Sequence, residues 1–293
     1  MNNKIFKFIK NKNLRLSTNE KFVGIIGANP SKNARSPKLW NKAYKKFKIK
    51  IAMYPLDVEK KNIGKLIKIL NKNKNFLGGS ITIPFKEKIF EILKKHATKE
   101  AKKIEAVNCM YRNQKGLLKI TNTDGEASLI SFKKKFKNNK IRNILVLGCG
   151  GVGKAVSAYF SQIKNLNKIT IVSRNKIDKK FAKKIKAIWL DRKNLKSLKI
   201  NYDLIINCTS LGFDKRKNKM PLPIFYLSKI PKSTIIYDVI YKPLKTNLIK
   251  ISEKKGLKTI NGLSMNLDQA AIAFSYVNNI KKLELIKDAM GEK

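Results

Sequence analysis

Acidic residues and histidine are scarce in this chain. Its 293 residues include 19 aspartates and glutamates against 66 lysines and arginines, and a single histidine. That histidine, His96, leaves a histidine-based zinc site or a Ser-His-Asp triad with little to build on. We therefore expect no metal site and interpret His96, which follows a helix-like segment, as an ordinary surface residue.

Cysteines and long apolar runs are also few. Cys109, Cys149 and Cys208 lie far apart, each in or beside an apolar run, which predicts buried, reduced thiols in a cytosol-like compartment. No apolar stretch approaches the roughly 18 residues that a membrane helix needs. The apolar block within 1–20 is too short and interrupted for a secretory signal. We expect a cytoplasmic protein with no membrane partner, and a frayed N-terminal extension over 1–20 rather than a targeting arm.

The excess of positive charge, +47 in formal net charge, has two interpretations. One is a protein that binds nucleic acid or a membrane surface. The other is a general bias toward lysine, asparagine and isoleucine, as A+T-rich coding produces. The lysines are spread along the chain and outnumber the arginines, which bidentate phosphate and base recognition prefers. We favour the bias, with incidental binding of polyanions and no specific nucleic-acid partner.

Short apolar runs alternate with amphipathic stretches along the chain. In the first half the strand-like runs are 22–27, 49–56, 79–83 and a hairpin pair at 107–111 and 117–121. The helix-like stretch 36–47 begins with Ser36 as N-cap and Pro37 at the first helical position. In the second half the buried-type strands are 142–148, 168–174, 202–209 and 234–241. Their alternation with helical or loop segments predicts a parallel, doubly wound sheet.

The pattern of strand-like and helix-like segments changes near residue 125. We expect two α/β domains, over 21–124 and 125–261, preceded by the extension. From Gly262 a helical tail runs toward the C-terminus, and we expect 262–293 to complete the first domain.

A glycine-rich loop, Gly148-x-Gly150-x-x-Gly153, follows a strand directly and opens a helix. The first glycine permits a tight turn, the second lets backbone approach a pyrophosphate, and the third lets helix and strand pack closely. The N–H groups of the helix N-terminus then face the anion. We interpret the loop as a dinucleotide site rather than merely a tight strand-to-helix turn.

The next strand ends in Ser173-Arg174-Asn175, where an NAD-binding unit would place an aspartate or glutamate on the ribose 2′-hydroxyl. No carboxylate is present, and an arginine suits a 2′-phosphate. We therefore expect NADP rather than NAD. The alternative is that Arg174 is one more basic surface residue.

A series of short segments follows in one order between about residues 22 and 274: GANPSKNARSPKLWN, GGSITIPFKE, EAVNCM, TNTDG, the glycine loop, SRN, NCTSLG, YDVIYKPLKT and GLSMNLDQA. In this order they resemble the shikimate dehydrogenase family. The resemblance implies an N-terminal substrate domain and a Rossmann-like NADP-binding domain. It implies NADPH-dependent, reversible reduction of 3-dehydroshikimate to shikimate, a step of aromatic amino acid biosynthesis, and leaves room for a homodimer.

The resemblance also implies roles for single residues. The catalytic pair is Lys86 and Asp124. The substrate-binding positions are Ser36, Thr82, Asn108, Tyr241 and Gln269. The cofactor-binding positions are Gly148, Gly150, Gly151, Gly153, Ser173, Arg174, Asn175, Thr209, Gly262 and Met265.

The chemistry of the pair agrees with these roles. Reducing a ring ketone needs a hydride from the nicotinamide and a proton for the developing alkoxide, which a lysine ammonium can stabilise and protonate. A paired aspartate orients the lysine and accepts a hydrogen bond from a substrate hydroxyl. Without the resemblance, Lys86 would be read as a solvated lysine at a helix start and Asp124 as a helix cap.

The periphery departs from the family pattern. Ala34 stands where a serine that holds the substrate carboxylate is usual, and the lost hydrogen bond is worth roughly 1.5–3 kcal/mol. Ser80 and Ser173 replace asparagines, and Ala127 replaces a glycine. Two alternatives therefore stay open: a quinate- or aminoshikimate-type dehydrogenase of the same fold, and a basic nucleic-acid-binding protein on an inactive dehydrogenase scaffold.

Overall fold

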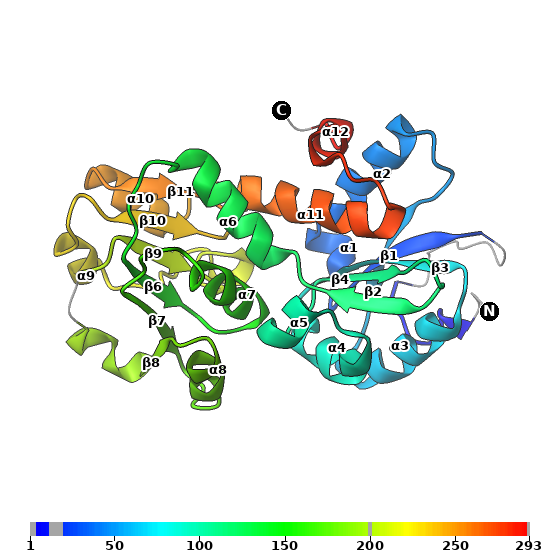
Figure 1. The fold of residues 1–293 in the computed structure, drawn as a ribbon, viewed down its shortest axis with the longest axis horizontal. Helices are drawn as coiled ribbons and strands as arrows, with labels where there is room; N and C mark the ends of the chain where they lie inside the picture. Colours follow the sequence, from blue (N-terminus) through cyan, green and yellow to red (C-terminus); the bar gives the residue numbers. More distant parts are fainter. Residues whose placement is uncertain (1–3, 12–19, 199–200, 292–293) are drawn as a thin grey trace. The chain divides into compact units, whose positions relative to one another are not determined.

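Residues 4–11, 20–198 and 201–291 are described by the computed structural model. They form two compact units, one of Met1–Thr123 with Gln269–Lys293 and the other of Asp124–Asp268. Each unit has its own β-sheet flanked by helices (Figure 1). This confirms the predicted fold class of two α/β domains. The second boundary between the units falls inside helix α11 (Leu263–Asn278).

The sheet of the first unit is mixed. Its strands are β1 (Phe22–Gly27), β2 (Met53–Asp57), β3 (Phe76–Ile81), β4 (Cys109–Arg112) and β5 (Leu118–Thr121), in the spatial order β2-β1-β3-β4-β5. β1 pairs in parallel with β2 and β3, whereas β4 is antiparallel to β3 and β5. The predicted hairpin is therefore confirmed as β4–β5. The parallel strands direct the carboxyl ends of β1, β2 and β3 to one edge, where the next loops begin.

Helices flank this sheet. They are α1 (Pro30–Asn33), α2 (Ser36–Lys46), α3 (Ile63–Lys72), α4 (Lys86–Leu93) and α5 (Lys99–Ile104), with short 3-10 turns η2 (Lys60–Asn62) and η3 (Lys94–His96). Helix α12 (Leu283–Ala289) packs against α2. In α3 the apolar stripe Ile63, Leu66, Ile67 and Leu70 recurs at helical spacing and is fully buried. This stripe joins the core that the buried faces of β1 and β3 supply.

The expected N-cap role of Ser36 is wrong. The chain is already in helical conformation at Arg35, so α2 begins at Ser36 itself, without a side-chain cap from any described residue. Ala34 before it is extended and ends the preceding helical turn, because its N–H still bonds to Pro30 O at 3.0 Å. Pro37 therefore lies at the second helical position and not, as predicted, at the first.

The N-terminal segment 4–11 is packed, so the expectation of a frayed extension is wrong for these residues. Ile5 and Ile9 are buried in the core of the first unit, and Ile9 forms an antiparallel bridge with Val58. Lys10 N donates to Asp57 O at 2.7 Å. Burial of two isoleucines favours this docking by an amount on the order of 3 kcal/mol. Residues 1–3 and 12–19 lie outside the described residues.

The second unit contains a 6-stranded sheet in the order β11-β10-β9-β6-β7-β8 (Figure 1). Its strands are β6 (Asn143–Leu147), β7 (Lys168–Ser173), β8 (Ile188–Asp191), β9 (Leu204–Asn207), β10 (Ile235–Asp238) and β11 (Lys258–Ile260). Its other elements are helices α6 (Asp124–Lys135), α7 (Gly151–Phe160), α8 (Asp178–Lys184), α9 (Ile224–Ser228) and α10 (Asn247–Lys254), with 3-10 turns η4 (Arg192–Ser197) and η5 (Asp214–Arg216).

All the strand pairs in this sheet are parallel, which confirms the predicted doubly wound sheet. From β6 the chain moves outward to β7 and β8, then returns to β9 on the other side of β6. The reversal creates a switch point at the carboxyl ends of β6 and β9, the place where doubly wound sheets bind ligands. The edge strands β8 and β11, which are short, were not predicted.

Candidate functional site

In the first unit, Thr82 and Lys86 follow the carboxyl end of β3. Thr82 N donates to Ile26 O at 2.8 Å, so the segment stays fastened to β1 for one residue beyond the strand. The chain then turns, with Phe85 N donating to Thr82 O at 3.1 Å, and α4 begins at Lys86. The turn contains a cis peptide bond between Ile83 and Pro84. These contacts fix where the Lys86 side chain leaves the backbone.

Lys86 differs from the lysine two positions further on. Its side chain is half-buried, whereas Lys88 on the same helix is exposed. The carbonyl of Lys86 accepts a hydrogen bond from Val107 N at 3.0 Å, which ties the helix start to the segment before β4. Lys86 therefore occupies a partly enclosed, well-anchored position that most of the lysines of the chain do not share.

Asn108 is the centre of a buried hydrogen-bond cluster. It is 2% exposed, and its Oδ1 accepts from Thr123 N at 2.7 Å. Its Nδ2 donates to Thr123 Oγ1 at 2.9 Å and to Gln269 Oε1 at 3.2 Å. Thr123 Oγ1 also donates to the backbone carbonyl of Gln269 at 3.0 Å. The structure thus brings together two predicted substrate residues, Asn108 and Gln269, that are far apart in sequence. It adds Thr123, which sequence reasoning missed although it adjoins Asp124.

The segment between β1 and α2 contains Ala34, and Ser36 is the first residue of α2. Ser36 is buried, and Ala34 is half-buried. Asp57, 6% exposed at the end of β2, holds this loop by accepting hydrogen bonds from both Ser31 N, at 2.9 Å, and Ser31 Oγ. This anchor was not predicted, because in the sequence Asp57 looks like any acid at a strand end.

In the second unit, Asp124 is the first residue of α6 and is 4% exposed. The helix lies tightly against α7: a Cβ at Gly125 would come within 2.6 Å of Ala155 O and 2.3 Å of the Tyr159 ring. Only glycine permits this approach. The close packing fixes the position from which the Asp124 carboxylate projects.

The glycine loop joins β6 to α7, which begins at Gly151. Gly148 has φ +97°, a conformation that favours glycine, and its N–H donates to Val172 O at 2.8 Å. A Cβ at Gly153 would lie 2.1 Å from Gly148 O. At Gly150, by contrast, a Cβ would meet no described heavy atom within 4 Å. The space beside Gly150 and the N–H groups of α7 therefore suit a pyrophosphate.

Ser173, Arg174 and Asn175 end β7 and begin the loop after it. Ser173 is buried, and its Oγ accepts from Trp189 Nε1 at 2.8 Å. Arg174 and Asn175 are exposed, and Asn175 Oδ1 accepts from Ile177 N at 3.2 Å, which shapes the turn into α8. The side chain of Arg174 is thus available at the carboxyl edge of the sheet, next to the glycine loop.

Polar side chains also gather at the ends of β9 and β10. Asn207 Oδ1 accepts from Thr209 N at 3.0 Å and from Thr209 Oγ1 at 2.7 Å. Asn207 Nδ2 donates to Asp238 Oδ1 at 3.0 Å, and Thr246 Oγ1 donates to Asp238 Oδ2 at 2.7 Å. Burial raises the pKa of Asp238 to about 6, although these hydrogen bonds lower it. Thr209 was predicted, whereas Asn207, Asp238 and Thr246 were not counted among the site residues.

The remaining predicted residues lie around the same edge. Gly262 precedes α11, and a Cβ there would be 1.9 Å from Val239 O, directly after β10. Met265, in the first turn of α11, is buried. Tyr241 follows β10 and is half-buried. The second unit therefore collects every predicted cofactor residue on the elements that surround the carboxyl ends of its strands.

The thiols and the histidine are ordinary. Cys109 and Cys149 are buried and Cys208 is half-buried, all as free cysteines. Burial raises the pKa of Cys208, so its thiol stays protonated. His96 ends η3 and is half-buried. Among the described residues, no group of three or more His, Cys, Asp or Glu side chains is arranged for a metal ion. No described helix is long and apolar enough to cross a membrane.

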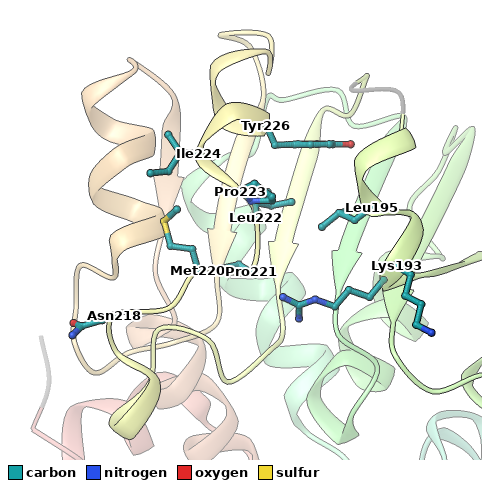
Figure 2. Close-up of a pocket in the computed structure, with 10 residues that line it drawn as sticks. Lys193, Leu195, Asn218, Met220, Pro221, Leu222, Pro223, Ile224 and Tyr226 are labelled. Atoms are coloured by element: carbon teal, nitrogen blue, oxygen red, sulfur yellow. The ribbon is translucent and has the colours of Figure 1, made fainter.

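A separate hollow of about 480 Å³ lies in the second unit between η4 and the segment leading into α9. Figure 2 shows Lys193 and Leu195 on one side of the view and Asn218, Met220 and Ile224 on the other. The hollow is lined mainly by apolar side chains. Its charged lining residues are Arg192 and Lys193, both from η4. None of the predicted site residues contributes to it.

Comparison with known families agrees with this geometry. The family model described as shikimate dehydrogenase substrate binding domain matches residues 25–110. The model described as saccharopine dehydrogenase NADP binding domain matches residues 144–214, which include the glycine loop and the loop after β7.

Whole proteins match over nearly the full chain. A shikimate dehydrogenase (NADP(+)) of Carboxydothermus hydrogenoformans is 34% identical over 286 residues, covering 95% of this chain and 99% of the relative. A crystal structure of shikimate dehydrogenase in complex with NADP+ superposes with a TM-score of 0.79 at 26% identity, covering 94% of this chain and 96% of that one. The Listeria monocytogenes enzyme, solved with shikimate and NAD, gives a TM-score of 0.77 at 25% identity over 94% and 98% of the two chains. The resemblance inferred from the motifs is therefore confirmed: this chain belongs to the shikimate dehydrogenase family.

Proposed function

We propose that the protein interconverts 3-dehydroshikimate and shikimate with NADP(H). The observation that carries the proposal is the position of Lys86, half-buried at the start of α4 directly beyond β3. Parallel strands of α/β enzymes present their catalytic groups at this edge. The named relatives support the same substrate and cofactor. We accordingly assign the substrate domain to 21–124 with 262–293 and the NADP-binding domain to 125–261.

NADPH, when bound, supplies the hydride for the carbonyl carbon. The residues that fit its phosphates are Gly148, Gly150, Gly151 and Gly153 at the N-terminus of α7, with Ser173, Arg174 and Asn175 after β7. Thr209, Gly262 and Met265 complete its binding surface. The open space beside Gly150 is where the backbone can approach the pyrophosphate without a side chain in between.

Lys86 acts as the general acid. Its ammonium donates a hydrogen bond to the substrate carbonyl and gives up a proton as negative charge develops on that oxygen. Asp124, held at the start of α6, accepts a hydrogen bond from a substrate hydroxyl. In the reverse direction, Lys86 takes the proton back from the hydroxyl that becomes the ketone.

Five further residues are assigned to substrate contacts. Asn108 and Gln269, joined by a hydrogen bond of 3.2 Å, present amide groups that suit ring hydroxyls. Thr82 and Tyr241 complete these contacts, and Ser36 holds the substrate carboxylate. Because Ala34 lacks a hydroxyl, Ser36 supplies only part of the usual pair of donors. We also propose a cytoplasmic location, as expected from the sequence, and a homodimer, which the family resemblance allows.

The test is oxidation of shikimate followed by NADPH absorbance, with NAD+ and quinate as matched controls. We expect turnover with shikimate and NADP+, and kcat/KM values lower for quinate and for NAD+. A higher kcat/KM for quinate would assign the protein to the quinate-type alternative, which the altered loop at Ala34 favours. No turnover with either substrate, together with salt-sensitive RNA binding, would replace the enzyme with the nucleic-acid-binding alternative.

A further inference from the structure

Two arginines end neighbouring strands at the carboxyl edge of the second sheet. Strands β7 and β8 run in parallel, and Ser173 at the end of β7 is in register with Asp191 at the end of β8. The next residues are Arg174 and Arg192. Because adjacent strands lie about 4.8 Å apart, the two arginines leave the sheet from adjacent positions. They are separated in sequence by a helix and by a strand that the sequence did not reveal.

The local contacts hold this arrangement in place. Trp189 on β8 donates from Nε1 to Ser173 Oγ at 2.8 Å, which fastens β8 to the last residue of β7. Asp191 Oδ1 accepts from Lys193 N at 2.9 Å and fixes the start of η4, where Arg192 is the first residue. The backbone at Arg192 is therefore fixed by the Trp189 contact before it and by the Lys193 contact after it.

The two guanidinium groups repel one another. Partial burial lowers the pKa of Arg192, and the positive charge of Arg174 lowers it further. The half-buried Arg192 and the exposed Arg174 have no ion pair with any acidic residue among the described residues. Two neighbouring cations without a counter-ion are stabilised when an anion with several acceptor oxygens binds between them.

We infer that Arg192 is a second determinant of cofactor specificity, which binds the 2′-phosphate of an adenosine nucleotide jointly with Arg174. The inference rests on the proposed NADP-dependent function. The 2′-phosphate is a dianion with three acceptor oxygens, so it can accept hydrogen bonds from both guanidinium groups. A nucleotide with only a 2′-hydroxyl brings no negative charge to this position, so the repulsion between the two guanidinium groups is not compensated. Arg192 thereby favours NADP over NAD.

The test is direct binding without catalysis, using 2′,5′-ADP and ADP as ligands in titration calorimetry. Arg192→Gln keeps a polar side chain and removes the charge. We expect it to weaken 2′,5′-ADP binding by about 10- to 100-fold while ADP binding changes less than about threefold. The control is Arg142→Gln, an exposed arginine just before β6 at the opposite edge of the same sheet. It removes the same charge and should leave both affinities within about twofold.

The outcomes separate the inference from the proposed function. If the wild-type protein binds 2′,5′-ADP no more tightly than ADP, the NADP assignment fails and the inference fails with it. If the wild type prefers 2′,5′-ADP and Arg192→Gln keeps that preference, only the inference is overturned. An equal loss for both ligands in Arg192→Gln, or a thermal unfolding temperature well below that of Arg142→Gln, would mean a structural role and would also overturn it.

Discussion

Alanine substitutions in the glycine loop test separately why Gly153 and Gly150 must each be glycine. In Gly153→Ala the new Cβ would lie 2.1 Å from Gly148 O and 2.8 Å from Gly148 C, both backbone atoms. Real Cβ atoms essentially never approach closer than 3.0 Å, so the turn between β6 and α7 must open by about 1 Å. Overpacking of this kind costs about 1–3 kcal/mol, and the better helix propensity of alanine offsets up to about 1 kcal/mol. We expect a net loss of roughly 1–2 kcal/mol in stability without any ligand.

Gly150→Ala is the matched control. Gly150 has φ −75°, which alanine adopts easily, and its Cβ would meet no described heavy atom within 4 Å. Stability should fall by only about 0.5 kcal/mol, from the weaker N-cap. NADP+ binding should nevertheless weaken at least tenfold, because the methyl group occupies the space where the backbone approaches the pyrophosphate.

The assay can isolate the second unit. Of the two tryptophans, Trp40 lies in α2 of the first unit and Trp189 in β8 of the second. In a common Trp40→Phe background, urea unfolding followed by fluorescence reports on Trp189 alone, and NADP+ binding is measured by calorimetry. The reasoning would be refuted if Gly153→Ala were as stable as its parent, or if Gly150→Ala bound NADP+ unchanged.

Three further predictions concern buried polar groups and the substrate loop. Asn108→Ala leaves the buried Thr123 N–H without its acceptor and should destabilise the protein by about 1–3 kcal/mol in urea unfolding; a shift below 0.5 kcal/mol would contradict the cluster. The folded state binds the Asp238 proton more tightly than the unfolded state, so its contribution to stability is present below about pH 4 and is lost as the pH rises through about 6. Between pH 4 and 7 the unfolding free energy of the wild type should therefore fall by roughly 2 kcal/mol relative to that of Asp238→Asn. A difference between the two proteins that does not change with pH would contradict this. Ala34→Ser restores a hydroxyl near Ser36 and should lower the KM for shikimate about tenfold at unchanged kcat, whereas an unchanged KM would show that another donor already holds the carboxylate.

The strands with the clearest signals were predictable because their pattern is local. The run at 22–27 and the apolar part of 142–148, from Ile144 on, both end in glycine, so a buried strand followed by a turn is the only element they suit well. β8 and β11 are edge strands of four and three residues with exposed positions, so each is too short to show a clear strand pattern in the sequence.

The contacts that complete the site could not be read from the sequence. Ser31 and Asp57 are 26 residues apart, and Asn108 and Gln269 are 161 apart. Which polar groups meet depends on strand order, and strand order depends on the packing of the whole sheet. Arg192 is a further example, because its place beside Arg174 follows from the register of a strand that was not predicted. The frayed extension was wrong for the same reason: the apolar surface that receives Ile5 and Ile9 exists only in the folded sheet.

The central claim is that Lys86 is the proton donor among the many lysines of the chain. The direct measurement is steady-state shikimate oxidation with NADP+ by Lys86→Ala and by Lys88→Ala, which remove the same charge from the same helix two positions apart. We predict that Lys86→Ala lowers kcat by a factor of roughly 10²–10⁴ with NADP+ affinity retained, and that Lys88→Ala stays within about twofold of the wild type. A Lys86→Ala variant that keeps wild-type turnover, or an equal loss in both variants, would contradict the account.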